Sequence, residues 1–144
     1  MALVRRVRLL ETLVCLLEDI KTQIRFKNAG LFEIIETLKQ YGCYQHIKFL
    51  FGLEHSVDFQ KTWAQCVERS IQNGEIGKED GEILYSFGSQ LGQSDVAGQL
   101  AHCDIHIELL KKRLGDAKAK KDSHSKLYIS LGLLVGLGAG LLLI

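Results

Sequence analysis

The strongest constraint on this chain is its C-terminal stretch, because residues 127–144 contain no charged side chain. At about 1.5 Å rise per residue, a helix of this length spans roughly 27 Å, close to the hydrocarbon thickness of a bilayer. Its only side-chain polar groups are the hydroxyls of Ser130 and Tyr128, and a tyrosine ring favours the edge of a bilayer. We therefore predict a membrane anchor over residues 126–144, with residues 1–125 forming one helical domain at the membrane surface.

The residues ahead of the anchor predict an all-α fold, an antiparallel helical bundle. The chain contains no Pro among its 144 residues, and its apolar residues recur at helical rather than strand spacing. A narrow apolar seam predicts a first amphipathic helix from about Leu3 to Lys27, along Leu3, Val7, Leu10, Val14, Leu17 and Ile24. Four shorter helices are expected next: one from Leu31 closed by Gly42, one near 47–52, one capped by Ser56 and stopped by Asn73-Gly74, and one over 78–91 stopped by Gly92.

The last helix ahead of the anchor is the most regular element of the sequence. Its apolar residues alternate steps of four and three: Val96, Leu100, Cys103, Ile107, Leu110, Leu114 and Ala117. Such a row packs along a neighbouring helix at a shallow crossing angle. Because no Pro separates this helix from the anchor, we expect it to continue toward the membrane as one rod, with residues 123–125 as its weakest joint.

Basic residues are concentrated directly ahead of the anchor. Residues 111–126 carry seven Lys and Arg against two Asp, although the whole chain has a net charge of only +1. Lys and Arg beside a spanning helix stay on the cytoplasmic side and are attracted to anionic headgroups, which predicts a cytoplasmic helical domain. Nucleic-acid binding is the competing explanation. Because no aromatic residues are interleaved with these lysines, we predict no nucleic-acid partner.

Candidate catalytic and metal-ligating residues are few. His102 and His106 share one helix face at a spacing that suits a metal ion, with Cys103 beside them. No phosphate-binding Gly loop, nucleophile elbow or H-E-x-x-H motif accompanies them. The four cysteines are spread singly, which indicates a reducing compartment: Cys15, Cys43, Cys66 and Cys103. Three of the four fall on or beside apolar stripes, as expected for small buried hydrophobic side chains. We predict no catalytic residue, no cofactor and no metal site, while a metal or redox enzyme using His102, Cys103 and His106 stays as an alternative.

The anchor contains a row of small residues, because Gly132, Gly136 and Gly140 form two successive G-x-x-x-G steps on one face. Small residues four apart let two helix backbones approach closely inside lipid, which predicts helix packing and self-association in the membrane. The alternative interpretation is that Gly is simply frequent in spanning helices.

These residues together resemble the stage III sporulation protein AB family of endospore-forming bacteria. The resemblance covers most of the chain and is strongest from Trp63 onward. Its parts, in order, are Thr62-Trp63, Glu82-Ile83-Leu84, Phe87-Gly88, Leu91-Gly92-Gln93-Ser94-Asp95, Gln99, His102, Leu110, Ala117, a Lys-rich stretch and residues 130–137.

The resemblance implies a structural role rather than a catalytic one. It implies a place in the secretion-like complex built between mother cell and forespore, in the mother-cell membrane. The cytoplasmic domain would be similar to the inner-membrane platform domain of type II secretion systems. The implied partners are a stage III sporulation protein AA-type ATPase, other membrane components of the complex and the lipid bilayer. A tail-anchored helical regulator or adaptor is the alternative function, although no Asn-Trp-Gly-Arg groove signature occurs.

Four residues match the motif of that family: Gly92, Asp95, Gln99 and His102. We expect them to form a joint between two helices, with Gly92 ending one helix and Ser94 or Asp95 capping the next. The chain departs from the family at its start, where residues 1–4 lead straight into two arginines in place of an additional apolar segment. Either an upstream span is missing or the protein is anchored only at its C-terminus.

Overall fold

A computed structural model of the chain describes the backbone of residues 2–27 and 30–143, and the side chains of residues 3–27 and 30–122. Within these residues every regular element is helical, so the all-α prediction is confirmed. The elements are α1 (Ala2–Phe26), α2 (Leu31–Leu38), the 3₁₀ turn η1 (Gly42–Tyr44), α3 (Lys48–Phe51), α4 (Phe59–Gln72), α5 (Lys78–Gln90) and α6 (Val96–Leu143).

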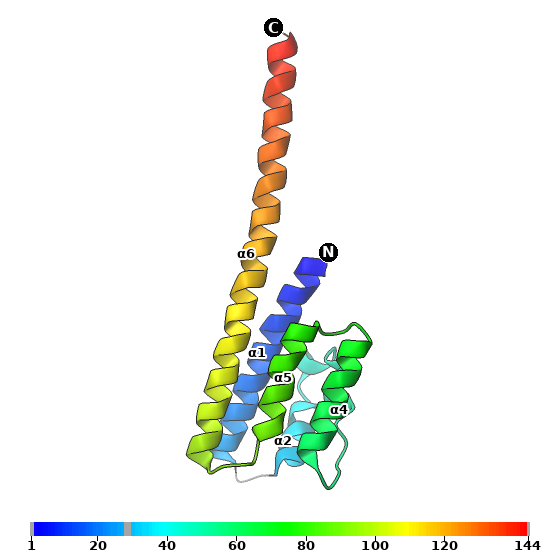
Figure 1. Ribbon diagram of the computed structural model, residues 1–144, viewed down its shortest axis with the longest axis vertical. Helices are drawn as coiled ribbons and strands as arrows, with labels where there is room; N and C mark the ends of the chain where they lie inside the picture. Colours follow the sequence, from blue (N-terminus) through cyan, green and yellow to red (C-terminus); the bar gives the residue numbers. More distant parts are fainter. Residues whose placement is uncertain (1, 28–29, 144) are drawn as a thin grey trace.

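The bundle is built around two long helices that lie side by side and run in opposite directions, α1 and α6 (Figure 1). Helix α5 packs against α6, and α4 packs against α5, while the short elements between α1 and α4 cover the remaining side of the core. At 48 residues α6 is about 72 Å long and continues well past the end of α1. It is one unbroken helix, as the absence of Pro suggested.

None of the helices, over the part of the chain whose side chains are described, is long and apolar enough to cross a membrane. The predicted anchor, residues 126–144, lies outside that part, as do the side chains of Gly132, Gly136 and Gly140.

Helix α1 buries a wider face than the narrow seam that its sequence suggested. Leu10 and Leu17 of the seam are fully buried, but so are Leu13, Leu16 and Ile20, which the prediction left out. The reason is that α1 has neighbours on two sides, with α6 along one and α2 and η1 along the other. The seam prediction was therefore right for the α6 side and too narrow for the whole helix.

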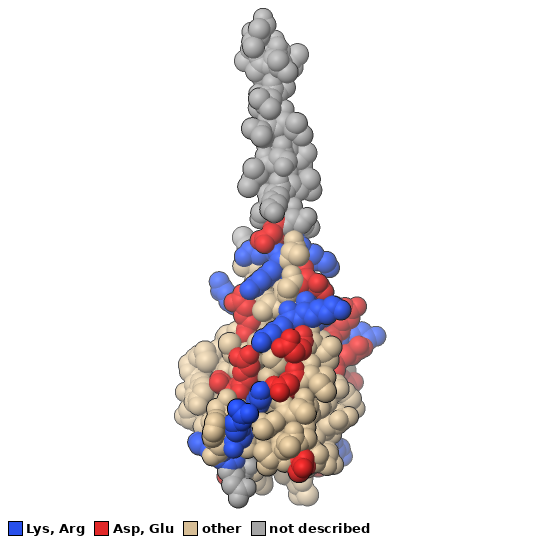
Figure 2. Space-filling view, turned by 90° about the vertical axis from the view of Figure 1, so that its left-hand side faces the viewer, with Lys and Arg blue, Asp and Glu red and all other residues tan. Residues whose placement is uncertain are grey.

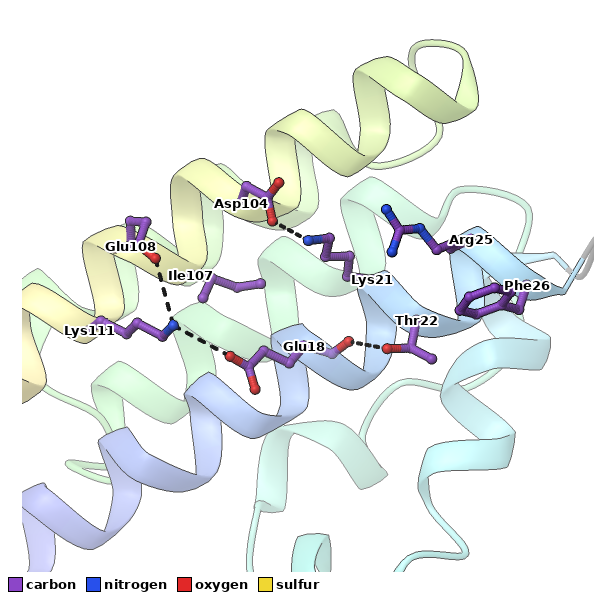
Figure 3. A pocket seen from close by; sticks show the side chains of 9 residues that line it. All are labelled: Glu18, Lys21, Thr22, Arg25, Phe26, Asp104, Ile107, Glu108 and Lys111. Carbon is purple, nitrogen blue, oxygen red and sulfur yellow. Dashed lines mark hydrogen bonds and ion pairs between the residues drawn. The ribbon is translucent and has the colours of Figure 1, made fainter.

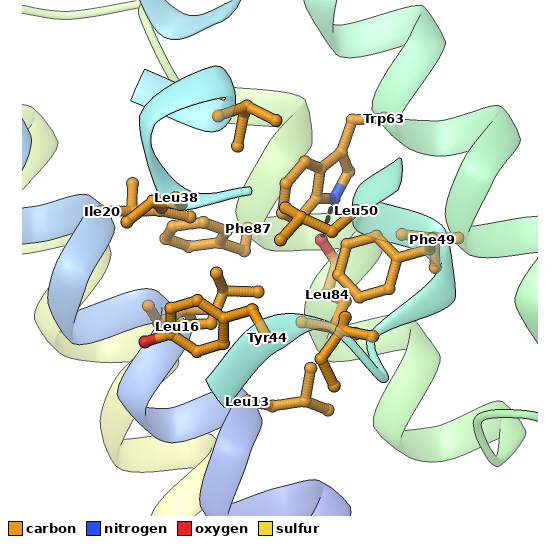
Figure 4. Close-up of a cluster of buried hydrophobic side chains, with 14 of the residues drawn as sticks. Leu13, Leu16, Ile20, Leu38, Tyr44, Phe49, Leu50, Trp63, Leu84 and Phe87 are labelled. Carbon is orange, nitrogen blue, oxygen red and sulfur yellow. Dashed lines mark hydrogen bonds between the residues drawn. The ribbon is translucent and has the colours of Figure 1, made fainter. Parts of the chain in front are cut away.

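The centre of the bundle is an aromatic cluster around Trp63 of α4 (Figure 4). The indole is fully buried, and its Nε1–H donates to the carbonyl of Leu84 on α5 at 2.7 Å. The Phe49 ring meets it edge-on at a centroid distance of 5.3 Å, and the Phe87 ring lies 5.8 Å away. Edge-to-face pairs of this kind add about 0.5–1.5 kcal/mol beyond the area that they bury. The cluster therefore holds α3, α4 and α5 together.

The N-cap of α4 differs from the predicted one. Ser56 was expected to cap the helix, but α4 begins later and Asp58 is its cap, accepting a bond from the Lys61 backbone N–H at 3.1 Å. The Ser56 hydroxyl instead lies 2.6 Å from the hydroxyl of Thr62. Both residue types make good caps, so the sequence alone did not distinguish between them.

The contact between α4 and α5 depends on a residue without a side chain. A Cβ atom added at Gly88 would lie 2.0 Å from Cδ1 of Trp63, so the indole occupies the space that any other residue would need. Overpacking a core costs about 1–3 kcal/mol. Gly115 of α6 is a matched control because nothing lies within 4 Å of its added Cβ.

We predict that Gly88→Ala lowers the free energy of unfolding by about 1–3 kcal/mol. The same change at Gly115 should raise it by about 0.5–1 kcal/mol, because Ala loses less backbone entropy than Gly in an exposed helix. Urea unfolding followed by the fluorescence of Trp63, the only tryptophan, measures both changes. Equal effects at the two positions would contradict the close contact.

Candidate functional site

The turn between α5 and α6 is the most organised polar feature at this end of the bundle. Gly92 has φ +78°, a left-handed conformation that other residues rarely adopt. Its backbone N–H donates to Oε1 of Gln99 at 3.2 Å, and the Gln99 amide donates back to the carbonyl of Ser94 at 3.1 Å. Asp95 caps α6 by accepting from the Gly98 N–H at 2.8 Å. One side chain, Gln99, thus closes the turn from within α6.

Two histidines attach the start of α6 to α5. His102 donates from Nε2 to the Phe87 carbonyl at 2.7 Å, and its ring stacks on the Phe87 ring at an interplanar angle of 9°. His106 is buried, with Nδ1 2.9 Å from the His102 carbonyl and Nε2 2.9 Å from the Ser86 hydroxyl. Because a carbonyl can only accept, Nδ1 carries the proton and Nε2 accepts from Ser86. Burial lowers the pKa of His106, which favours this neutral form.

The arrangement joins the two histidines but leaves Cys103 out. The His102 and His106 ring centroids are 4.2 Å apart, and Nε2 of His102 and both ring nitrogens of His106 bond to protein groups. Cys103 lies in the hydrophobic core, where burial raises its pKa to about 11, so its thiol is protonated at neutral pH. In the described part of the chain no three His, Cys, Asp or Glu side chains gather at metal-binding distances.

Two cysteines are buried, where the sequence placed three of the four on or beside apolar stripes. Cys66 and Cys103 are buried, whereas Cys15 on α1 and Cys43 in η1 are exposed.

A buried ion-pair cluster around Asp80 connects three helices. Asp80, in the first turn of α5, is 2% exposed. It accepts from Arg6 of α1 at 3.1 Å and from Arg113 of α6 at 2.9 Å, and Arg113 also contacts Glu79 at 2.8 Å. Burial alone would raise the pKa of Asp80, but the hydrogen bonds and charges of the two arginines outweigh it and hold the pKa below its usual range.

The sequence analysis missed this cluster. In the sequence, Asp80 is an ordinary acidic residue near a helix N-terminus, where a negative charge interacts favourably with the helix dipole. Arg6 and Arg113 lie 74 and 33 residues away. One sequence feature could have indicated the cluster. Both arginines are next to apolar positions of their helices, which places them at the edge of a buried face.

A groove between the C-terminal half of α1 and α6 is lined by ion pairs (Figure 3). Lys111 lies between Glu18 and Glu108, 3.6 Å from each, and Lys21 donates to Asp104. The pairs of Lys111 with Glu18 and of Lys21 with Asp104 join the two helices. The groove thus contributes to the alignment of α1 with α6, and its partly exposed pairs add little stability each.

The described residues thus define a helical bundle whose polar groups join helices to one another, and the contact between Ser86 and His106 is one of these links between α5 and α6. The chain matches the family described as stage III sporulation protein AB over residues 1–144, and it belongs to that family. The resemblance inferred from the sequence motifs is confirmed.

Two similar proteins carry the same description. Stage III sporulation protein AB of Bacillus subtilis (strain 168) is 27% identical over 137 residues, which cover 92% of this chain and 80% of that protein. A solved structure of a stage III sporulation protein AB superposes with a TM-score of 0.65 at 22% identity, over 83% of this chain and 98% of the other. The second comparison shows that the two chains share a fold, and the family match supports a role in stage III of sporulation.

We predict that Asp80→Asn lowers the free energy of unfolding by about 3 kcal/mol at neutral pH, because two arginines lose their shared counter-ion. This loss is at the lower end of the usual range for breaking a buried ion pair, because the side chains of Arg6 and Arg113 remain 26% and 29% exposed. The folded-state pKa lies below the value of about 3.9 in an unfolded chain, so the stabilisation is complete above that value and disappears as the pH falls through the folded-state pKa.

Urea unfolding over a series of acidic pH values tests this prediction. The native chain should lose more stability than Asp80→Asn between neutral and acidic pH. Asp116→Asn, at an exposed position of α6, is the control and should behave like the native chain. Parallel pH profiles for the native chain and Asp80→Asn would contradict the ion-pair assignment.

Proposed function

We propose that this protein is a membrane-anchored structural component of the complex that connects mother cell and forespore in stage III of endospore formation. One observation carries the proposal: α6 leaves the bundle as an unbroken helix and leads into the uncharged residues 127–144. Family membership supplies the sporulation stage. A helix that belongs to both the bundle and the anchor suits a scaffold, because it fixes the position of the domain at the membrane.

The proposed orientation has the bundle in the mother-cell cytoplasm. The excess of Lys and Arg between residues 111 and 126 supports it, since such residues are retained on the cytoplasmic side of a spanning helix. The proposed domains are residues 1–125 for the bundle and 126–144 for the anchor. Gly132, Gly136 and Gly140 are proposed to pack against another membrane helix, and self-association through them is part of the proposal.

The proposed partners are a stage III sporulation protein AA-type ATPase on the cytoplasmic side and the other membrane components of the complex. The resemblance of the sequence to this family, and through it to the platform domain of type II secretion systems, supports them. The described polar side chains, including Ser86 and His106, bond between helices, and this favours a scaffold over an enzyme.

The proposed role of Gly92, Asp95, Gln99 and His102 is to fix the joint between α5 and α6. Their contacts, given above, hold the turn from both sides. If the joint sets the packing of α6, Gly92 should tolerate substitution less well than a glycine with the same backbone angle in an ordinary turn. Gly74, with φ +73°, is such a glycine.

We expect Gly74→Ala to lower the free energy of unfolding by about 1–2 kcal/mol, because a residue with a Cβ atom is strained in the left-handed conformation. Gly92→Ala should cost more, because its Cβ would also lie 3.2 Å from Leu31 of α2, whereas nothing lies within 4 Å at Gly74. Urea unfolding of both variants gives the difference. Equal costs would mean that the joint is an ordinary turn.

The functional proposal predicts that a deletion strain of an endospore-forming host grows normally but arrests after engulfment. The full chain should restore heat-resistant spores, and a chain without residues 127–144 should not. A chain in which those residues are replaced by an unrelated spanning helix separates anchoring from specific helix packing.

Spore counts after heat treatment, together with flotation of each form with membranes, measure the outcome. Full restoration by the truncated chain would contradict the anchor. Restoration by the replaced helix would support anchoring and argue against a role for the glycine row. Normal sporulation in the deletion strain would overturn the proposed function as a whole.

A further inference from the structure

The antiparallel packing of α1 and α6 brings basic residues from both ends of the chain to one level. Lys111 pairs with Glu18 at 3.6 Å, and Lys118 pairs with Glu11 at 3.9 Å. Moving seven residues toward the C-terminal end of α6 therefore corresponds to moving seven residues toward the N-terminal end of α1. Extending the same register by one turn places Arg8 level with Lys121, and Figure 1 shows the start of α1 beside α6 on the side where α6 continues.

We name the basic residues near this level the basic collar: Arg5, Arg8, Lys118, Lys120 and Lys121. All except Lys121 are exposed, and Lys121 is half-buried. Three acidic residues lie among them: Glu11, which pairs with Lys118, and the exposed Asp116 and Asp122. Figure 2 shows blue side chains, with red ones interspersed among them, at the end of the bundle where the described surface stops.

Two further arginines at this end are already neutralised. Arg6 and Arg113 point inward to Asp80, and Arg113 also pairs with Glu79, so these four charges cancel. The collar therefore has five positive charges against three negative ones. Its members are long, flexible side chains on the surface, whereas a phosphate-binding pocket would hold an anion between fixed donors.

We propose that the basic collar binds the anionic phospholipid headgroups of the membrane that α6 enters. The proposal rests on the anchor described under Proposed function and adds a second point of attachment, α1. Arg5 and Arg8 lie more than a hundred residues from the anchor in the sequence, and the fold alone brings them to the membrane surface. Attachment through two helices holds the bundle upright, because tilting would lift one side of the collar from the headgroups.

The test uses the full chain reconstituted in phosphatidylcholine vesicles that contain a small amount of spin-labelled lipid. Electron paramagnetic resonance measures how strongly the protein retains labelled phosphatidylglycerol relative to labelled phosphatidylcholine. The collar variant is Arg5→Gln/Arg8→Gln. The matched control is Arg25→Gln/Lys27→Gln, which removes the same charge from exposed positions at the opposite end of α1.

We expect the native chain and the control to prefer phosphatidylglycerol severalfold, and this preference to fall toward one at high salt. The collar variant should lose up to about fivefold of the preference for each arginine removed. Its thermal midpoint should match that of the control, because both pairs of side chains are exposed.

Flotation separates failure of the collar from failure of the anchor. Equal lipid preference in the two variants, with all forms floating with vesicles, would overturn the collar and leave the anchor intact. Failure of every form to float would overturn the anchor and the collar with it. Loss of binding to duplex DNA in the collar variant, with lipid preference unchanged, would overturn the lipid assignment in favour of nucleic acid.

Discussion

The packing of α1 against α6 is the contact on which the rest of the structure depends. These helices come from opposite ends of the sequence, and their apolar faces form one continuous core with Leu10, Leu17, Ile107 and Leu110. Ion pairs along the edge set their register, although such exposed pairs add little to stability. The apolar contact supplies most of the free energy, at about 25 cal/mol per Å² of buried apolar surface. The charges determine which residues lie at the same level.

The Asp80 cluster links this helix pair to α5. A buried carboxylate is costly unless its charge is compensated, and here one arginine from each long helix compensates it. The cluster therefore ties the start of α5 to a single relative position of α1 and α6. It also draws Arg6 and Arg113 inward, which leaves the neighbouring Arg5 and Arg8 facing outward at the collar.

The sequence predicted the long elements well and the specific contacts poorly. Helical periodicity identified α1 and α6, because amphipathic rows of this length have few alternative structures. Periodicity underestimated the width of the buried face of α1. A single apolar row indicates one buried side of a helix, whereas a second neighbour of α1 covers Leu13 and Leu16. Asp80 was not predicted because its partners lie on other helices. In contrast, the family motif singled out Gly92, whose backbone angle is a local property.

The order in which the helices occur along the chain has a consequence for biosynthesis. Helix α1 leaves the ribosome first, and its main partner, α6, is made last. The apolar face of α1 therefore stays without its final cover until almost the whole polypeptide has been synthesised, which makes the nascent chain a natural client of chaperones.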